Sequence, residues 1–367
     1  MLKAIRATDR ILFLSILTLV IGGLFIFLSA SLGLLAGNGA QFSDVALGQI
    51  VLGLGGGTVA LLIAMTLPYR LWRRVALFGF VASLILTLAV FVPHFGVELN
   101  GAHRWLRVGP ITFQPSELLK ITYILYLATW LSNAKSTISD PRRGLIPFSI
   151  ITGLAGLALL IQPDTDTFLV IVAAGGAMFV TAGAKLRDLA LIVLVGAIGL
   201  GILITMRPYL AARVTTFMHP ENDPRGNSYQ IQQSLLAVGA GEIFGRGFGQ
   251  SIQKFGKLPE PISDSIFSVF AEEFGFVGSL VLILAFLTFA MRGLWVAARS
   301  PDLFGGLLAV GIVVLVIFQS FLNIGAMLAL LPLSGLPLVF ISHGGSALLV
   351  ALGSVGILLS VSRSVRT

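Results

Sequence analysis

The sequence predicts an all-α polytopic membrane protein with about ten transmembrane helices. Of its 367 residues, 56% are hydrophobic and only 11% are charged, whereas a soluble domain usually carries about 25% charged residues. Several apolar runs exceed the ~20 residues that a helix needs to cross about 30 Å of hydrocarbon. The ten-residue alternation typical of a membrane β-barrel is missing from the sequence. We therefore expect residues 1–367 to form a single integral membrane domain.

The apolar segments define the individual spans by their length and their polar boundaries. They fall near residues 11–31, 46–67, 75–95, 114–133, 146–162, 166–184, 189–206, 264–291, 303–330 and 344–361. An even number of spans places both termini on the same side of the membrane.

Basic residues indicate which side that is. They occur before the first span, in alternate loops and after the last span: Lys3, Arg6, Arg10, Arg70, Arg73, Arg74, Lys135, Arg142, Arg143, Lys185, Arg187, Arg292, Arg299, Arg363 and Arg366. Loops rich in Lys and Arg stay in the cytoplasm. The sequence therefore predicts that both termini are cytoplasmic.

The remaining polar residues collect on the opposite, extracytoplasmic face. They lie in four connections, at residues 96–113, 162–167, 207–263 and 331–343. The third is a long loop between spans seven and eight, and loops of this length are uncommon without a function. We therefore expect a functional site at the outer boundary of the membrane, with residues 207–263 carrying part of it.

Composition also excludes several classes of protein. The chain has no cysteine, so it forms neither disulfides nor thiolate metal sites. Its four histidines, at positions 94, 103, 219 and 343, have no metal-ligand spacing. The net charge of +8 is concentrated in short loops that fix topology, so we expect membrane lipid and no nucleic acid as a partner. No organic cofactor is expected either.

The first polar cluster precedes the fourth span and contains Arg104, Glu117 and Lys120. Pro115 suits the first turn of a helix, and Glu117 and Lys120 are three residues apart, so that their side chains can pair. Two interpretations stay open. The two side chains form an internal ion pair that joins two spans, or Arg104 and Lys120 belong to an anion-binding pocket.

The second cluster is the break Gln162-Pro-Asp-Thr-Asp-Thr167 between two apolar spans. Asp164 or Thr165 can cap the following helix, the carboxylate of Asp164 by accepting hydrogen bonds from the free amides. Capping does not explain Asp166, because two carboxylates so close in sequence repel each other. A divalent cation such as Mg²⁺, or a nearby arginine, would offset that repulsion. Asp164 and Asp166 are therefore candidate metal ligands.

The third cluster is the long loop, which is basic although it faces outward. Arg246 and Lys254 lie among glycines that allow the backbone to approach a ligand closely, and Glu260 follows. Asp264 closes the loop where apolar sequence resumes, and a carboxylate at a membrane edge is costly without a partner or a function. Asp264 is either a helix cap or the centre of the site. For Glu272 and Glu273 we expect structural roles.

The fourth cluster is the approach to the last span. Two prolines precede Ser342, His343 and Ser346. Non-helical polar backbone at this depth must be buried in protein or line a cavity. Ser342 and His343 are adjacent in sequence and do not form a nucleophile–base pair, so no catalytic triad is predicted.

These clusters, in this order across ten spans, resemble the SEDS family of bacterial cell-wall polymerases, the RodA/FtsW group. The resemblance covers essentially the whole chain. It rests on Asn100, Gly101, Arg104 and Trp105; Gln114-Pro-Ser-Glu117 with Lys120; Gln162-Pro-Asp164; Tyr229, Gln230, Gln233 and Ser234; Leu258-Pro-Glu260; Asp264 with Ile266 and Phe267; Glu272-Glu-Phe-Gly275; and Gly335-Leu-Pro with Ser342 and Gly344-Gly-Ser346. The segments 249–254 and 29–31 look more like the division branch, FtsW, than the elongation branch.

The chain departs from the family pattern at three places. Asp166 stands where the family usually has glycine, and Ile262 and Ser263 stand where it usually has His-Thr. His343 replaces a usual tyrosine. The first departure leaves Asp166 without an assigned role, and the second removes a family histidine from the neighbourhood of Asp264.

The resemblance implies a peptidoglycan glycosyltransferase that polymerises lipid II at the outer face of the cytoplasmic membrane and releases undecaprenyl pyrophosphate. It implies that Asp264 is the essential residue and candidate base, and burial would raise its pKa towards a useful range. The residues expected to bind substrate are Arg104, Glu117, Lys120, Asp164, Arg246, Lys254, Glu260, Ser342 and Ser346.

The resemblance also implies partners and a location. The expected partners are a class B penicillin-binding transpeptidase and other division or elongation proteins, and the expected place is the division septum. Two other classes of function stay open. One is a lipid II flippase or another transporter, whose ionisable residues are expected near the bilayer midplane. The other is a non-catalytic scaffold for cell-wall enzymes.

Overall fold

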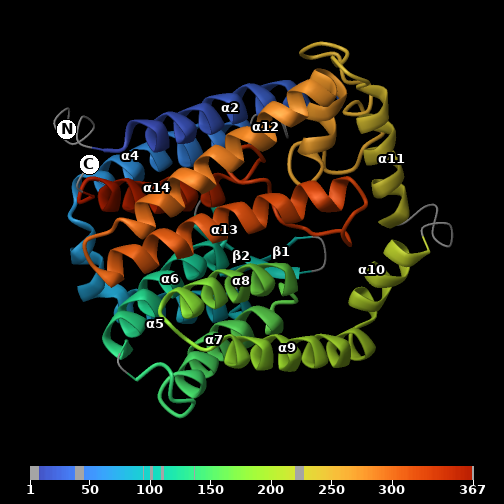
Figure 1. Cartoon of the computed structure of the whole chain (residues 1–367). Helices are drawn as coiled ribbons and strands as arrows, with labels where there is room; N and C mark the ends of the chain where they lie inside the picture. Colours follow the sequence, from blue (N-terminus) through green and yellow to red (C-terminus); the bar gives the residue numbers. More distant parts are fainter. Residues whose placement is uncertain are drawn as a thin grey trace.

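A computed structural model describes residues 8–37, 45–93, 95–99, 102–108, 111–135, 137–219 and 227–365. Most of the long helices run side by side in roughly one direction (Figure 1). The elements are α2 (Arg10–Gly37), η1 (Gly48–Gly56), α4 (Gly57–Thr66), η2 (Tyr69–Leu71), α5 (Trp72–Leu88), η3 (Ala89–Phe91), β1 (Gly96–Leu99), β2 (Ala102–Val108), β3 (Ile111–Phe113), α6 (Pro115–Ala134), α7 (Leu145–Ile161), α8 (Thr165–Thr181), α9 (Leu186–Met206), α10 (Pro208–Met218), α11 (Asn227–Ala240), α12 (Ile266–Ala298), α13 (Leu303–Met327) and α14 (Gly345–Ser362).

All ten predicted spans lie on helices, which confirms a polytopic membrane protein. Seven helical segments of the described chain are long and apolar enough to cross a membrane: Arg10–Ala36, Val45–Thr66, Tyr69–Phe91, Leu186–Met206, Ile266–Ala298, Leu303–Met327 and Gly345–Ser362. Two more, α7 and α8, are apolar helices of 17 residues each. The tenth, α6, has 20 residues and carries Glu117 and Lys120.

The two ends of the described chain meet at one end of the bundle (Figure 1). The amide of Asp9 donates to Ser362 Oγ over 3.2 Å. Asp9 also pairs with Arg292 at the end of α12, at 2.6 Å. At the same end Arg363 donates to the backbone oxygen of Thr66 over 3.1 Å. Arg292 and Arg363, two of the basic residues used to predict topology, therefore lie at the same end of the bundle as both ends of the described chain, as an even number of spans requires. Lys3, Arg6 and Arg366 lie outside the described residues.

Helix α13 forms the centre of the bundle, and most of its residues are buried. It packs against α12, α8, α6 and α14. In contrast, α9 lies at the edge beside α8 and α10, and Asp188 is its one buried residue (Figure 1). A helix that is apolar all round and exposed is suited to lipid.

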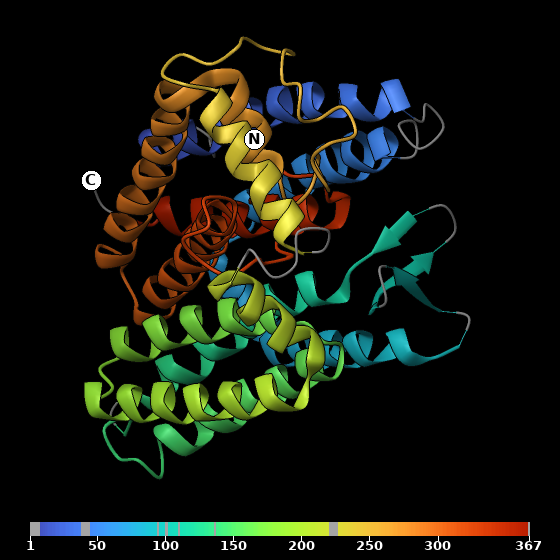
Figure 2. The same cartoon turned by 90° about the vertical axis from the view of Figure 1, so that its right-hand side faces the viewer.

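The opposite end of the bundle holds structure that the sequence pattern did not predict. Residues 96–113 include a three-stranded antiparallel sheet in the order β1-β2-β3. Residues 207–263, expected to be a loop, include the helices α10 and α11. Pro208 starts α10 directly after the extended residue Arg207, and proline suits that first helical position. Figure 2 looks onto this face, with the sheet to one side of α10 and α11.

Helix α12 is interrupted near its outer end at Gly275, which has a φ of 65° and a ψ of −162°. Glycine adopts this conformation without steric cost. Residues 242–247 replace the lost helical hydrogen bonds: the amides of Arg246 and Gly247 donate to Glu272 and Glu273, and those of Phe276 and Val277 donate to Glu242 and Ile243, over 2.9–3.0 Å. The break therefore joins the long outward segment to α12.

Candidate active site

Asp264 lies two residues before α12, at the outward end of the bundle. Its backbone oxygen accepts a hydrogen bond from Asn323 Nδ2 of α13 over 2.7 Å. The same nitrogen donates to the backbone oxygen of Leu336 over 2.8 Å. One buried asparagine thus ties the Asp264 segment to the connection between α13 and α14, residues 328–344.

Two further bonds join the same segments. Ser342 Oγ donates to the backbone oxygen of Ser263 over 2.6 Å. The amide of His343 donates to the backbone oxygen of Ile262 over 2.7 Å. Ser342 therefore supports the backbone next to Asp264. Gly335 of this connection lies beside the Asp264 carboxylate, because a Cβ at this position would be 3.8 Å from Asp264 Oδ2, an ordinary contact distance.

The carboxylate of Asp264 is half-buried and has no hydrogen-bond or ion-pair partner among the described residues. Burial raises its pKa to about 7, and the negative charges of Glu260 and Asp166 add to that shift. The positive charges of Arg213 and Arg104 oppose it. A carboxyl group with a pKa near neutral can accept a proton from a substrate hydroxyl, because it is basic and still partly ionised.

Asp166 is held by an arginine. Its Oδ2 lies 2.8 Å from Arg213 Nη1 of α10 and accepts a hydrogen bond from the amide of Gly335 over 3.1 Å. Asp166, which stands where the family usually has glycine, therefore connects α8 with α10 and with residues 328–344. It also places a carboxylate and a guanidinium beside Asp264.

Arg104 of β2 holds the turn that carries Asp164. Its Nε donates to the backbone oxygen of Gln162 over 3.2 Å, and its Nη2 donates to that of Pro163. Its Nη1 lies 4.0 Å from Asp164 Oδ1. Asp164 caps α8 by accepting a hydrogen bond from the amide of Thr167 over 3.4 Å, which is the capping role that its position suggested.

Arginines therefore offset the repulsion between Asp164 and Asp166, which was one of the two possibilities considered. No group of three or more His, Asp or Glu that could hold a metal ion occurs in the part of the chain that the structure describes. Mg²⁺ is usually bound by one or two carboxylates together with water and substrate phosphates. Asp166 Oδ2 is already bound by Arg213 and Gly335, and a divalent cation at these carboxylates stays a prediction.

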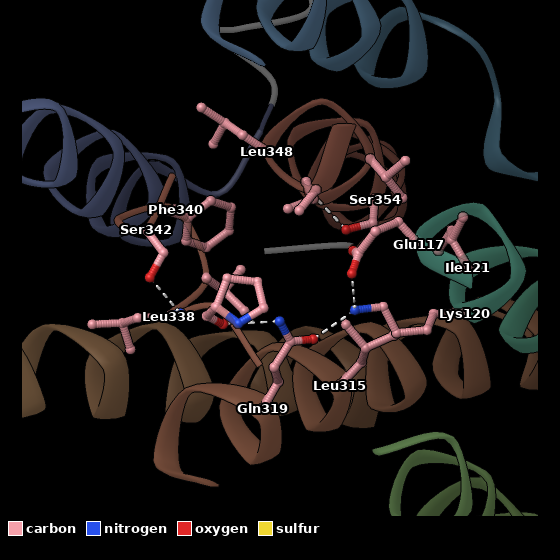
Figure 3. A pocket seen from close by; sticks show the side chains of 15 residues that line it. Glu117, Lys120, Ile121, Leu315, Gln319, Leu338, Phe340, Ser342, Leu348 and Ser354 are labelled. Carbon is pink, nitrogen blue, oxygen red and sulfur yellow. Dashed lines mark hydrogen bonds and ion pairs between the residues drawn. The ribbon is translucent and has the colours of Figure 1, made fainter. Parts of the chain in front are cut away.

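Glu117 and Lys120 form a buried ion pair, with Lys120 Nζ 2.9 Å from Glu117 Oε1. Lys120 also donates to Gln319 Oε1 over 2.7 Å, and Gln319 Nε2 donates to the backbone oxygen of Pro337 over 3.0 Å (Figure 3). This is the internal pair that joins spans. It borders a cavity of about 30 Å³, which has room for water.

Ser346 is also buried and structural in its contacts. Its Oγ accepts a hydrogen bond from the amide of Gln114, just before α6, over 3.3 Å. It thereby connects the start of α14 to the start of α6. Neither Ser346 nor the Glu117–Lys120 pair touches the Asp264 carboxylate in this structure.

Lys254 differs most from its expected role of stabilising a diphosphate. It is almost completely buried and donates to Ser29 Oγ, the backbone oxygen of Gly249 and Glu273 Oε1 over 3.1, 3.0 and 2.7 Å. An ammonium group has three protons, so all of them are engaged. The lysine holds residues 249–254 against α2 and α12.

Arg246 and Glu260 are more exposed. Arg246 Nε donates to the backbone oxygen of Ala240 over 3.3 Å and lies 3.5 Å from Glu272 Oε1. It therefore belongs to the structure around the break in α12. Glu260 accepts a hydrogen bond from Ser263 Oγ over 2.7 Å and acts on Asp264 through its charge.

Three residues near Asp264 were not among the predicted site residues: Arg213, Asn323 and Gln230. Gln230 Nε2 donates to Ser265 Oγ over 3.0 Å, next to Asp264. The sequence could have indicated Arg213, because the extracytoplasmic face of a membrane protein usually has few basic residues and Arg213 is one of them. Asn323 carried one too, because polar side chains within spans are usually functional.

The fold and the site together define a polytopic membrane protein with a half-buried carboxylate, that of Asp264, at one end of its helix bundle. A family model for the cell-cycle proteins FtsW, RodA and SpoVE matches residues 9–367. The chain belongs to this family.

Individual relatives are similar over most of their length. The chain is 40% identical to stage V sporulation protein E of Bacillus subtilis, over 84% of each protein. It is 38% identical to a probable peptidoglycan glycosyltransferase FtsW of Thioalkalivibrio sulfidiphilus, over 98% of this chain and 91% of that one.

Solved structures agree with the fold. A chain from a peptidoglycan synthase complex, studied for how polymerization and crosslinking are coordinated, matches with a TM-score of 0.78 and 28% identity. The match covers 97% of this chain and 98% of that one. The rod shape determining protein RodA of Thermus thermophilus matches with a TM-score of 0.70 and 27% identity over 98% of both chains.

Proposed function

We propose that this protein is a peptidoglycan glycosyltransferase that polymerises lipid II at the outer face of the cytoplasmic membrane. The observation that carries the proposal is the Asp264 carboxylate, half-buried and without a partner among the described residues. Its relatives named as peptidoglycan glycosyltransferases support the reaction type. A site at the membrane edge suits a substrate whose sugars lie at the interface while its tail stays in the bilayer.

In the proposed reaction Asp264 takes the proton from the hydroxyl of the acceptor sugar. The hydroxyl oxygen attacks the anomeric carbon of the donor sugar, and the bond between that carbon and undecaprenyl pyrophosphate breaks. The pyrophosphate leaves with the bonding electrons. General-base assistance of this kind typically contributes 10²–10⁴-fold to the rate.

Among the described residues, Arg213 and Arg104 are the cations whose charges act on Asp264, and in the proposed reaction they offset the charge of the departing diphosphate. Both guanidinium groups are partly accessible, with 25% and 21% of each side chain exposed. Guanidinium groups suit phosphate because they can donate two parallel hydrogen bonds. These two residues replace Lys254 and Arg246 in our proposal, because the charges of Arg213 and Arg104 act on Asp264. Lys254 is instead buried against Glu273, and Arg246 lies beside Glu272 at the break in α12.

A divalent cation such as Mg²⁺ would also stabilise a leaving diphosphate. The described residues offer it at most isolated carboxylates, and Asp166 is already paired with Arg213. A cation bound there would take its remaining ligands from the diphosphate and from water.

For partners we propose a class B penicillin-binding transpeptidase, which would cross-link the new strand, together with other division or elongation proteins. The similarity to a chain of a peptidoglycan synthase complex supports this proposal. The division septum is the proposed location, because many of the curated relatives are FtsW proteins.

The variant Asp264→Asn tests the function. Purified with its transpeptidase partner and supplied with lipid II, it should make no glycan strands, because an amide cannot accept the acceptor proton. Asp140→Asn is the matched control, since Asp140 is exposed in the loop at the other membrane face. Normal polymerisation by Asp264→Asn would disprove the assignment.

The same variant separates the other two functions. A lipid II flippase would lose translocation of lipid II across vesicles when Asp264 is replaced. A non-catalytic scaffold would keep its function in cells that carry Asp264→Asn, as in cells that carry Asp140→Asn. Our proposal expects neither result, because the carboxylate lies at the membrane edge and acts only in the chemical step.

A further inference from the structure

A charged cleft lies at the end of the bundle opposite Asp264, on the face that the basic loops assign to the cytoplasm. It has a volume of about 240 Å³ and is lined by Arg70, Arg73, Ser132, Asp302, Leu303 and Phe304. These residues come from η2, the start of α5, the end of α6 and the start of α13. The cleft therefore opens where three helices reach the membrane surface.

The acid in this cleft is already neutralised. Asp302 accepts hydrogen bonds from Tyr69 Oη over 2.7 Å, from Arg70 Nε over 2.9 Å and from the amide of Gly305 over 2.8 Å. It caps α13 and fixes the guanidinium of Arg70 at the edge of the cleft. Asp302 is thus engaged on several sides and adds little repulsion towards an anion.

Arg73 supplies the excess positive charge. Among the described residues it has no acidic partner; its Nη2 donates to Asn133 Oδ1, and its guanidinium lies 5.8 Å from the centre of the Phe304 ring. Arg74, the next residue, is also exposed. The guanidinium groups of Arg70 and Arg73 therefore face the cleft, together with the single carboxylate of Asp302. The net positive charge of the cleft favours an anion as its ligand.

We propose that this cleft binds a phosphate group, and that the phosphate belongs to an anionic phospholipid of the cytoplasmic leaflet. Arginine is well suited to phosphate oxygens, and basic pockets between transmembrane helices on the cytoplasmic side are suited to anionic headgroups. Leu303 and Phe304 add an apolar wall against which the start of an acyl chain can pack. Ser132 also lines the cleft, and its hydroxyl donates to the backbone oxygen of Thr129 over 2.9 Å.

The test measures lipid binding to the intact, detergent-solubilised protein by native mass spectrometry, with phosphatidylglycerol titrated and phosphatidylcholine as the neutral comparison. In Arg73→Gln we expect the affinity of the phosphatidylglycerol molecule that binds most tightly to fall about fivefold. This fall is equivalent to about 1 kcal/mol, the contribution of one basic residue at an anionic surface. Ser132→Leu, which narrows the cleft without changing charge, should lower it as well. Binding of phosphatidylcholine should not change in either variant.

Arg143→Gln is the matched control, because Arg143 is exposed on the same face but outside the cleft. If Arg143→Gln lowers the affinity as much as Arg73→Gln, the attraction belongs to the whole basic face and the proposed site is wrong. Inorganic phosphate forms the second arm. Arg73-dependent binding of inorganic phosphate without Arg73-dependent binding of the lipid would keep the phosphate site and overturn its assignment to a lipid.

Discussion

At the scale of single residues, Asp264 could be predicted from the sequence, but the cations around it could not. A carboxylate at the edge of an apolar segment is costly, and that cost is visible in the sequence. Lys254 looked like a ligand for phosphate because it follows a glycine-rich stretch. Its true partner, Glu273, lies 19 residues away on the first part of α12, just before the break at Gly275, and no sequence period indicates that pairing.

Asn323 gives a prediction at this scale. It is fully buried and donates to the backbone oxygens of Asp264 and Leu336, so Asn323→Ala should let the Asp264 segment shift. A displacement of about 1 Å can cost about 10²-fold in rate. We expect kcat for glycan synthesis to fall 10–100-fold while KM for lipid II changes little.

Ser320→Ala is the control for Asn323. Ser320 is also fully buried on α13, and its hydroxyl has no hydrogen-bond partner among the described residues. Steady-state kinetics of both variants provide the measurement. A wild-type kcat in Asn323→Ala, or a rise in KM alone, would show that Asn323 does not position Asp264.

At the scale of elements, the ten spans could be predicted because each is long and apolar, which is a property of the segment itself. The β1-β2-β3 sheet and the helices α10 and α11 could not. Their strands and helices are short or polar, and tertiary contacts such as the Asp166–Arg213 pair hold them. The break at Gly275 was also missed, because residues 242–247 supply its hydrogen bonds.

The contacts of Lys254 predict an effect on stability at this scale. Lys254→Met would leave the Glu273 carboxylate buried without its counter-charge, and breaking such a pair typically costs about 3–5 kcal/mol. The thermal midpoint in detergent should therefore fall clearly. The double variant with Glu273→Gln should recover part of the loss.

Lys257→Met is the control, because Lys257 is exposed three residues further along. It should leave the midpoint unchanged. If Lys254 instead bound the diphosphate, Lys254→Met would raise KM for lipid II and leave the thermal midpoint as it is.

At the scale of the whole molecule, the structure separates a basic end from an end that carries Asp264, and topology decides what each end faces. The chain has no cysteine, so single cysteines can report sidedness. Phe244, which is 80% exposed, lies at the Asp264 end, and Arg143 lies at the basic end. Phe244→Cys should react with a membrane-impermeant maleimide in intact spheroplasts, and Arg143→Cys only after permeabilisation. The reverse pattern would place the site on the cytoplasmic face.

The pH dependence of glycan synthesis tests the central claim, that Asp264 acts as the base. A base works only when it is unprotonated, and burial raises the pKa of Asp264 to about 7. The value of kcat/KM should therefore rise with pH through about 7 and level off above it. Glu260→Gln removes a negative charge that raises this pKa, so in that variant the rise should move to lower pH. A profile that is flat across this range, or one that Glu260→Gln leaves in place, would contradict the account.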